Sequence, residues 1–68
     1  MVIRDRSGKF QTVRPCNCGS TDIGFYYSMH DGEPYQTAVQ CEQCRDIGPY
    51  AGGQNEEEAA RLWNEAIR

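Results

Sequence analysis

Long apolar runs are missing from this 68-residue chain. No stretch approaches the ~20 consecutive apolar residues that a membrane-spanning helix needs, so we expect no membrane segment. Residues 1–14 also lack the apolar run of a secretion signal. We therefore expect the protein in a reducing cytoplasm, where disulfides are disfavoured.

Histidine is nearly absent as well. The chain has one histidine, His30, and shows neither a histidine beside a nucleophile nor a carboxylate pair with an evident pocket. We therefore do not expect an enzyme.

A chain this short supports one domain with a thin core, and ordinary packing stabilises such a domain by only about 3–10 kcal/mol.

The cysteines form two close pairs. Cys16 and Cys18 lie near the start, and Cys41 and Cys44 follow after 22 intervening residues. Two thiol pairs separated by an insert of hairpin length are typical of a zinc ribbon, in which both pairs bind one tetrahedral ion. A structural zinc contributes on the order of 10–16 kcal/mol, so metal binding and folding would be one event. We therefore predict one structural Zn²⁺ on these four cysteines.

The two pairs are not equivalent. The second has the usual two-residue gap, whereas Asn17 alone separates the first two cysteines. Gly19 follows the first pair and can take the positive φ that metal knuckles commonly need, but Arg45 follows the second and reaches that conformation only at a cost. His30 is an alternative ligand if the short pair does not chelate, although its place in the hairpin turn favours an exposed loop residue. The same four cysteines are also compatible with iron instead of zinc, with disulfides, or with thiols that simply pack in the core.

Charge is distributed unevenly along the chain. The formal net charge is −3, and four thiolates with one dication add −2, which gives −5 in the metal-loaded protein. Residues 1–14 sum to +3 and residues 15–68 to −6. The local positive charge comes from Arg4, Arg6, Lys9 and Arg14 against Asp5. Such a segment can contact phosphate, although a solvated strand surface is the simpler interpretation for so few charges.

We divide the chain into two parts. Residues 1–12 form a basic N-terminal arm or a small hairpin that turns at Ser7-Gly8, and residues 13–68 form a zinc-ribbon domain with a C-terminal helix. Within the ribbon, alternating hydrophobicity over residues 23–29 and 35–41 predicts two strands. The predicted fold class is therefore small α+β, with a β-hairpin between two cysteine knuckles and an amphipathic helix packed on it.

The turn of this hairpin is open to two interpretations. Turn chemistry alone favours a two-residue turn at 31–32, but that register mixes the apolar and polar faces of the strands. A five-residue loop instead pairs Phe25 with Val39 and Met29 with Tyr35, which keeps one face apolar. We therefore predict the longer loop.

The C-terminal segment carries the pattern of an amphipathic helix. Asn55 is a good N-cap, and Glu58 follows three residues later as in a capping box. An apolar stripe consists of Ala59, Leu62, Trp63, Ala66 and Ile67. A helix of this length is marginal alone, so we expect the stripe to pack on the apolar face of the hairpin, with Trp63 as the anchor.

Tyrosines exceed what so small a core can bury. Tyr26 lies on the less apolar side of its strand, and Tyr35 and Tyr50 add to the surplus. Exposed tyrosines can stack on single-stranded nucleic acid or mark a homodimer contact, although a half-exposed strand residue is the commoner outcome.

The combined motifs resemble the Lar-type restriction-alleviation proteins of phages and prophages over residues 13–65. The residues that carry the resemblance are Arg14-Pro15-Cys16-x-Cys18-Gly19-Ser20, Cys41-x-x-Cys44, Gly48-Pro49 and Glu57-Glu58-Ala59-Ala60-x-x-Trp63-Asn64. Two departures are the missing residue in the first cysteine pair, where the family usually has two residues beginning with proline, and Arg45 in place of a common glycine. The resemblance implies a small phage-encoded accessory, in the cytoplasm of a bacterial host, that protects incoming unmodified DNA from a type I restriction system, chiefly by favouring modification over cutting.

Several classes of function remain after these exclusions. We favour a protein-binding modulator whose acidic body docks on a basic restriction-modification subunit, with the zinc purely structural. The alternative is a nucleic-acid-binding zinc ribbon that uses the basic N-terminal segment. Self-association through exposed tyrosines and thiol redox chemistry are two further hypotheses.

Overall fold

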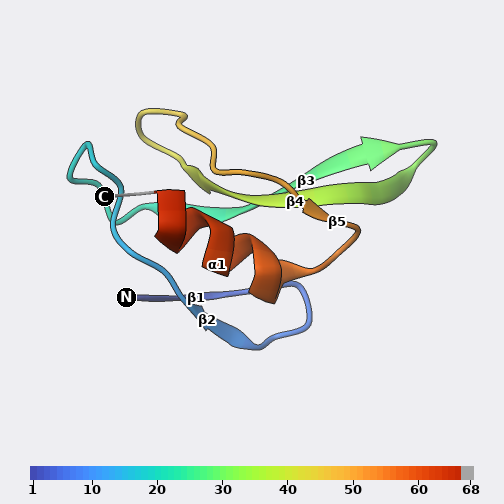
Figure 1. Ribbon diagram of the computed structural model, residues 1–68, viewed down its shortest axis with the longest axis horizontal. Helices are drawn as coiled ribbons and strands as arrows, with labels where there is room; N and C mark the ends of the chain where they lie inside the picture. The colour runs from blue at the N-terminus through green and yellow to red at the C-terminus, as the bar shows by residue number, and fades with distance from the viewer. Residues whose placement is uncertain (67–68) are drawn as a thin grey trace.

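Two antiparallel sheets and one helix make up the part of the protein that the structure describes. The computed structural model describes residues 1–66. The first sheet pairs β1 (Val2–Arg4) with β2 (Phe10–Thr12), and the second has the order β3 (Ile23–His30), β4 (Glu33–Cys41), β5 (Ala51–Gly52). The helix α1 (Glu56–Ala66) lies along one side of the second sheet (Figure 1). The small α+β class with a ribbon hairpin and a C-terminal helix is confirmed.

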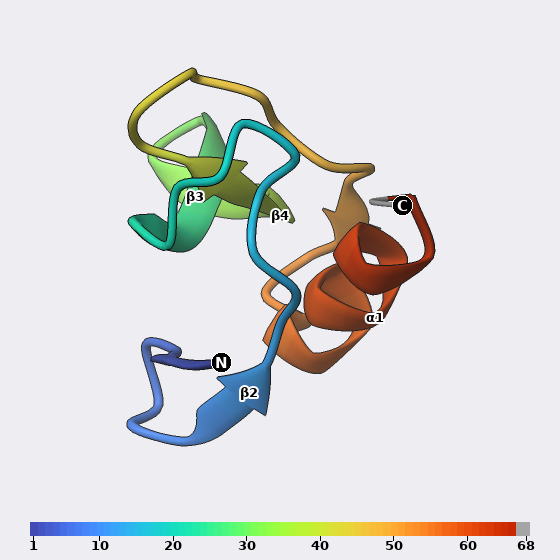
Figure 2. The same cartoon turned by 90° about the vertical axis from the view of Figure 1, so that its left-hand side faces the viewer.

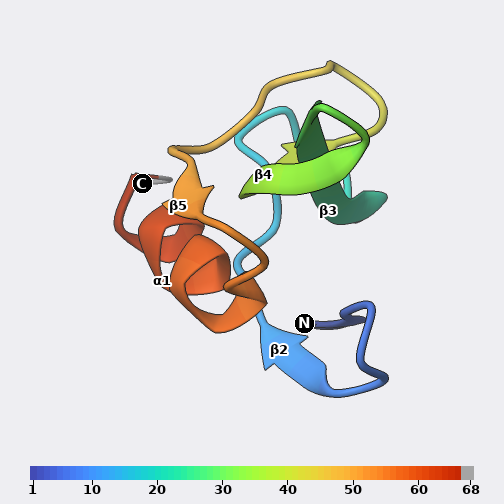
Figure 3. The same cartoon turned by 90° about the vertical axis from the view of Figure 1, so that its right-hand side faces the viewer.

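The core lies where the three-stranded sheet, α1 and the β1–β2 hairpin meet (Figures 2 and 3). Trp63 is fully buried at its centre, as predicted. Val39 of β4 packs in the same cluster, and so does Ile3 of β1. The first residues therefore pack against the ribbon as a small hairpin and contribute to the common core.

Within residues 1–66, no helix combines the length and apolarity needed to cross a membrane.

Asp5 organises the turn between β1 and β2. The residue is 7% exposed, and its carboxylate accepts hydrogen bonds from the Ser7 hydroxyl, the backbone N–H groups of Ser7 and Lys9, and the side-chain amide of Gln11. The Ser7 hydroxyl is the largest of the influences that lower the pKa of Asp5. The turn that the Ser7-Gly8 sequence predicts is therefore built around a carboxylate that the sequence pattern did not single out.

The β3–β4 hairpin differs from the prediction at its tip. Phe25 pairs with Val39 as expected, but the turn has two residues, Asp31 and Gly32, both with positive φ. The expected five-residue loop is therefore wrong. An irregularity after Ser28 leaves one extra residue, Tyr35, in β4, so the register changes by one along the hairpin. Because of this bulge, the hairpin has a two-residue turn and still keeps its apolar residues on one face.

The bulge also changes the predicted pairing near the tip. Met29 lies opposite Pro34, and the predicted pair of Met29 with Tyr35 does not form. Pro34 is consequently part of β4, where we expected a loop residue.

Helix α1 begins as its sequence predicts. The side-chain oxygen of Asn55 accepts a hydrogen bond from the Glu58 N–H at 3.0 Å, which confirms Asn55 as the N-cap. Ala59, Ala60 and Trp63 are buried, whereas Ala66, which we placed on the apolar stripe, is exposed. The predicted contribution of Ile67 lies outside the described residues.

Candidate metal centre

The first knuckle is a tight turn that begins at Cys16. The Gly19 N–H donates to the Cys16 carbonyl at 2.9 Å, and the Cys16 N–H donates to the Ser20 carbonyl at 3.1 Å. Gly19 has a φ of 90°, so the positive φ expected after this pair is present. The single residue between Cys16 and Cys18 is thus accommodated by a turn that closes through glycine.

The second knuckle closes through a residue that is not glycine. The Arg45 N–H donates to the Cys41 carbonyl at 3.0 Å, and the Cys41 N–H donates to the Asp46 carbonyl at 2.8 Å. Arg45 has a φ of 68°, so it takes the left-handed conformation that the spacing requires. The Glu42 N–H donates to the Asp22 carbonyl at 2.8 Å, which joins this knuckle to the segment that follows the first.

Hydrogen bonds from helix α1 fix the segment that leads into the first knuckle. Asn64 accepts a hydrogen bond from the Arg14 N–H at 2.8 Å and donates one to the Thr12 carbonyl at 2.9 Å. Trp63 donates its indole N–H to the Arg14 carbonyl at 2.8 Å. Because Arg14 lies two residues before Cys16, these bonds position the first ligand relative to the core.

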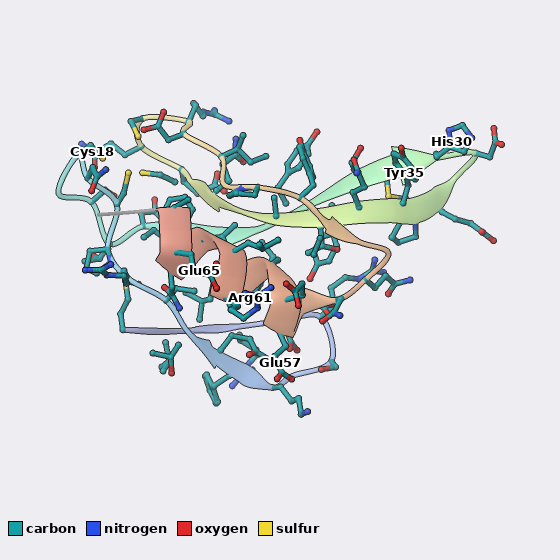
Figure 4. All side chains as sticks on the ribbon, viewed as in Figure 1. Cys18, His30, Tyr35, Glu57, Arg61 and Glu65 are labelled. Carbon is teal, nitrogen blue, oxygen red and sulfur yellow. The ribbon has the colours of Figure 1, made fainter. Side chains whose placement is uncertain are left out.

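The four cysteine sulfurs converge at one end of the molecule, where Figure 4 labels Cys18. All four Sγ atoms lie within 4.8 Å of one another, and the closest pairs are Cys16 with Cys44 at 3.5 Å and Cys18 with Cys41 at 3.6 Å. Thiolates on a tetrahedral zinc, with Zn–S bonds of about 2.3 Å, lie about 3.8 Å apart. All four cysteines are free, so the cluster has the composition and spacing of a four-thiolate metal site.

The ligands divide into an inner and an outer pair. Cys16 and Cys41 are buried and belong to the hydrophobic core, whereas Cys18 and Cys44 are exposed. Each knuckle supplies one ligand of each kind. A metal ion here would therefore connect both turns directly to the packed interior.

Backbone amides, desolvation and neighbouring sulfurs shift the pKa values of three of the cysteines. The N–H groups of Cys44 and Gln43 point at the sulfur of Cys41 and lower its pKa to about 6. At Cys44 the Asp46 N–H lowers the pKa, but partial desolvation of the sulfur and hydrogen bonding with the neighbouring sulfurs outweigh it and raise the pKa to about 12. At Cys16 the balance is of the same kind, and its pKa is raised. The pKa values of Cys16 and Cys44 are thus raised while that of Cys41 is lowered, and a bound dication would favour the thiolate form of its cysteine ligands.

His30 lies far from this cluster. It sits at the tip of the β3–β4 hairpin, at the opposite end of the molecule from Cys18 (Figure 4). Its ring is 5.6 Å from that of Tyr35, and its Nε2 is 3.5 Å from an Asp31 carboxylate oxygen. The structure therefore gives His30 no part in the metal centre.

Three basic residues of the N-terminal segment contact different parts of the protein. The Arg4 guanidinium lies 5.1 Å from the centre of the Phe10 ring, and that of Arg6 lies 5.1 Å from the centre of the Tyr27 ring. The side chain of Arg14 donates to the Asn64 carbonyl at 3.4 Å. Three of the four predicted phosphate contacts are thus engaged with different parts of the protein.

Comparisons with protein-family models, with curated proteins and with solved structures found no match for this chain.

Proposed function

We propose that the cysteine cluster binds one structural Zn²⁺. Four thiolates complete a tetrahedral shell and leave no position for a reactive water. Two of them, Cys16 and Cys41, belong to the core, so the ion would stabilise the fold itself. Elemental analysis should find one zinc per colourless chain, and a chelator should unfold the protein. One iron per chain with visible absorbance would instead identify the site as an iron centre.

We further propose that the protein modulates a type I restriction-modification system by binding one of its subunits in the cytoplasm of a bacterial host. The motif resemblance suggests this activity, but its most specific residues have structural roles. Trp63 is buried, and Asn64 is hydrogen-bonded to the segment before the first knuckle. The binding determinants must therefore lie on the surface.

The outer side of α1 supplies such a surface. Glu57, Arg61 and Glu65 lie along it (Figure 4). Arg61 pairs with Glu65 and with a third acidic residue of the helix, Glu58. Subunits that handle DNA carry basic surfaces, and complementary charge guides association with them. This acidic helix face is the observation that carries the proposal.

Direct nucleic-acid binding is the alternative function. It depends on a shared basic surface, and Arg6 and Arg14 are engaged separately with Tyr27 and Asn64. A titration of the zinc-loaded protein with DNA at several salt concentrations tests it. A steep fall of affinity with salt would favour the nucleic-acid function, whereas weak binding without a salt slope would exclude it.

The test of the proposed function is the plating efficiency of unmodified phage on a type I restricting host that expresses this chain. We expect the wild-type chain to raise plating, and the double variant Cys41→Ser, Cys44→Ser to lose the effect because the metal-held fold is lost. The variant Glu57→Lys, Glu65→Lys should remain folded and zinc-loaded and also lose the effect.

A charge-matched control distinguishes the effect of changing the helix face from the effect of changing the net charge. The variant Asp31→Lys, Glu33→Lys makes the same change at the hairpin tip, where both residues are exposed, and should retain activity. If the folded wild-type chain has no effect on plating, the restriction-alleviation function is wrong. If the helix and tip variants lose activity equally, the acidic helix face is not the binding surface.

A further inference from the structure

One face of the three-stranded sheet points away from α1 (Figure 1). Val39 and Ala51 are buried on the helix side, so the residues that alternate with them point to the other side. A Cβ on Gly48 would lie 2.9 Å from the Trp63 ring, so Gly48 also faces the helix and its neighbour Ile47 faces away. We call this surface the open face; it consists of Gly24, Tyr26, Ser28, Gln36, Ala38, Gln40, Ile47, Tyr50 and Gly52.

A pair of tyrosines forms a ridge across the open face. Tyr26 of β3 lies opposite Ala38 of β4, and Tyr50 lies on the other side of Ala38, one step beyond the Thr37–Ala51 pair. The two rings meet edge to face with their centres 6.5 Å apart. Ala38 is completely buried although each tyrosine remains 42% exposed. The rings therefore close over the alanine and project from the sheet.

The adjacent row of the sheet is low. Ser28, Gln36 and Gly52 lie side by side in the register of the three strands. Two of them have small or no side chains, and a Cβ added to Gly52 would meet nothing within 4 Å. We call this row, whose side chains at two positions are shorter than those of the Tyr26–Tyr50 ridge beside it, the hollow row.

The centre of the open face carries no acidic or basic residue, in a chain where 25% of residues are charged. Ionisable residues border it at both ends: the Glu42 carboxylate lies near Gly24 at the knuckle end, and the His30–Glu33 pair follows Ser28 at the hairpin tip. Phosphates or a basic partner would find no counter-charge across this face. Its tyrosine and serine hydroxyls and glutamine amides can each donate and accept hydrogen bonds, so a second copy of the face complements it.

We propose that the open face is a homodimer contact, in which a two-fold axis places the Tyr26–Tyr50 ridge of each copy in the hollow row of the other. Such an isologous contact uses one patch twice, and a ridge beside a hollow is the shape it requires. Tyrosines are enriched at interfaces and frequently dominate their energetics. The acidic outer side of α1 stays uncovered in this dimer, because α1 lies on the opposite side of the sheet.

Sedimentation equilibrium of the zinc-loaded full-length chain tests the dimer. We expect a concentration-dependent monomer–dimer equilibrium. The double variant Tyr26→Ser, Tyr50→Ser should raise the dimer dissociation constant at least about 100-fold, since a truncated anchor residue commonly weakens binding tenfold or more. Gln36→Glu is nearly isosteric and places a charge in the hollow row, so it should raise the constant at least about tenfold.

The matched control removes an equally exposed aromatic residue elsewhere. Phe10 is 61% exposed on the N-terminal hairpin, and Phe10→Ser should leave the dissociation constant unchanged. In a mixture of labelled and unlabelled chains, isotope-filtered nuclear Overhauser effects should connect the Tyr26 ring of one copy with Gln36 of the other.

Three results would overturn the proposal. The first is a chain that stays monomeric at all concentrations. The second is a dimer that is insensitive to Gln36→Glu while the variant binds one zinc. The third is a dimer that Phe10→Ser weakens and the tyrosine variant does not. If the tyrosine variant fails to fold, Gln36→Glu and the filtered spectra decide the question.

Discussion

The indole N–H of Trp63 donates a hydrogen bond to the carbonyl oxygen of Arg14 at 2.8 Å, which joins the C-terminal helix to the segment that leads into the first knuckle. Trp63 is fully buried and Arg14 is exposed, so this polar contact lies at the edge of the core. One side chain therefore provides the largest apolar surface of the helix and also fixes the backbone two residues before Cys16. The helix is therefore joined directly to the segment that presents Cys16.

The first prediction concerns that hydrogen bond. Trp63→Phe keeps an aromatic ring but leaves the Arg14 carbonyl without its donor and reduces the packed volume, so it should lower the free energy of unfolding by about 2–4 kcal/mol. Urea denaturation of the zinc-saturated protein measures the change. Asn64→Ala, which removes two more exposed bonds to the same strand, should cost less, about 1 kcal/mol. Equal stability of Trp63→Phe and the wild type would show that the bond contributes nothing.

The second prediction uses two glycines with different surroundings. A Cβ on Gly48 would approach the Trp63 ring to 2.9 Å, whereas a Cβ on Gly52 would meet no atom within 4 Å. Gly48→Ala should therefore destabilise the protein by about 1–3 kcal/mol through overpacking, and Gly52→Ala should be close to neutral. Thermal unfolding of both variants, side by side and zinc-loaded, provides the comparison. A Gly48→Ala variant as stable as Gly52→Ala would mean that the tryptophan moves aside freely.

Local sequence patterns predict the parts of this fold whose cause is local. Asn55 caps the helix because its side chain reaches an N–H three residues on, and this spacing is visible in the sequence. The position of Trp63 follows from helical periodicity in the same way. The cysteine pairs predict the metal cluster because each pair needs only its own turn to present two sulfurs.

The bulge and the N-terminal packing could not be predicted in this way. An extra residue at Tyr35 leaves the alternation of both strands intact, so the sequence offers two turns that are each consistent with part of the pattern. The burial of Ile3 depends on a core formed by residues far along the chain. The contact between Tyr26 and Tyr50 on the open face depends on the register of all three strands, which no local pattern of the sequence specifies.

The third prediction addresses the unequal knuckles. Arg45 has a φ of 68°, which is unfavourable for a residue with a Cβ. Arg45→Gly should relieve this strain, stabilise the zinc-loaded fold by about 1 kcal/mol and tighten zinc binding about fivefold. Gly19→Ala places a Cβ at a φ of 90° in the other knuckle and should weaken zinc binding. Competition with a chromophoric chelator measures both affinities.

A third variant controls for the change of charge. Arg45→Gly also removes a positive charge, so Arg45→Ala should be compared with it, since alanine removes the charge but retains the backbone strain. If Arg45→Ala tightens zinc binding as much as Arg45→Gly, charge rather than conformation determines the effect.

The last prediction follows from the ionisation of Tyr27. Burial raises its pKa to about 12, and the nearby charge of Glu56 adds to the effect; the Tyr27 hydroxyl donates to a Glu56 carboxylate oxygen at 3.2 Å. An unfolded tyrosine titrates near pH 10, so the folded state keeps the proton more tightly. The stability that the neutral hydroxyl provides is fully present below pH 10 and is lost as the pH rises towards 12. The free energy of unfolding should therefore fall across this window, and Tyr27→Phe should make the fall shallower. Tyr26→Phe, which changes a tyrosine on the opposite face of the same strand, should retain the wild-type slope in denaturation curves recorded from pH 9 to about 12. If Tyr26→Phe and Tyr27→Phe flatten the curve equally, the contact with Glu56 does not govern the alkaline loss of stability.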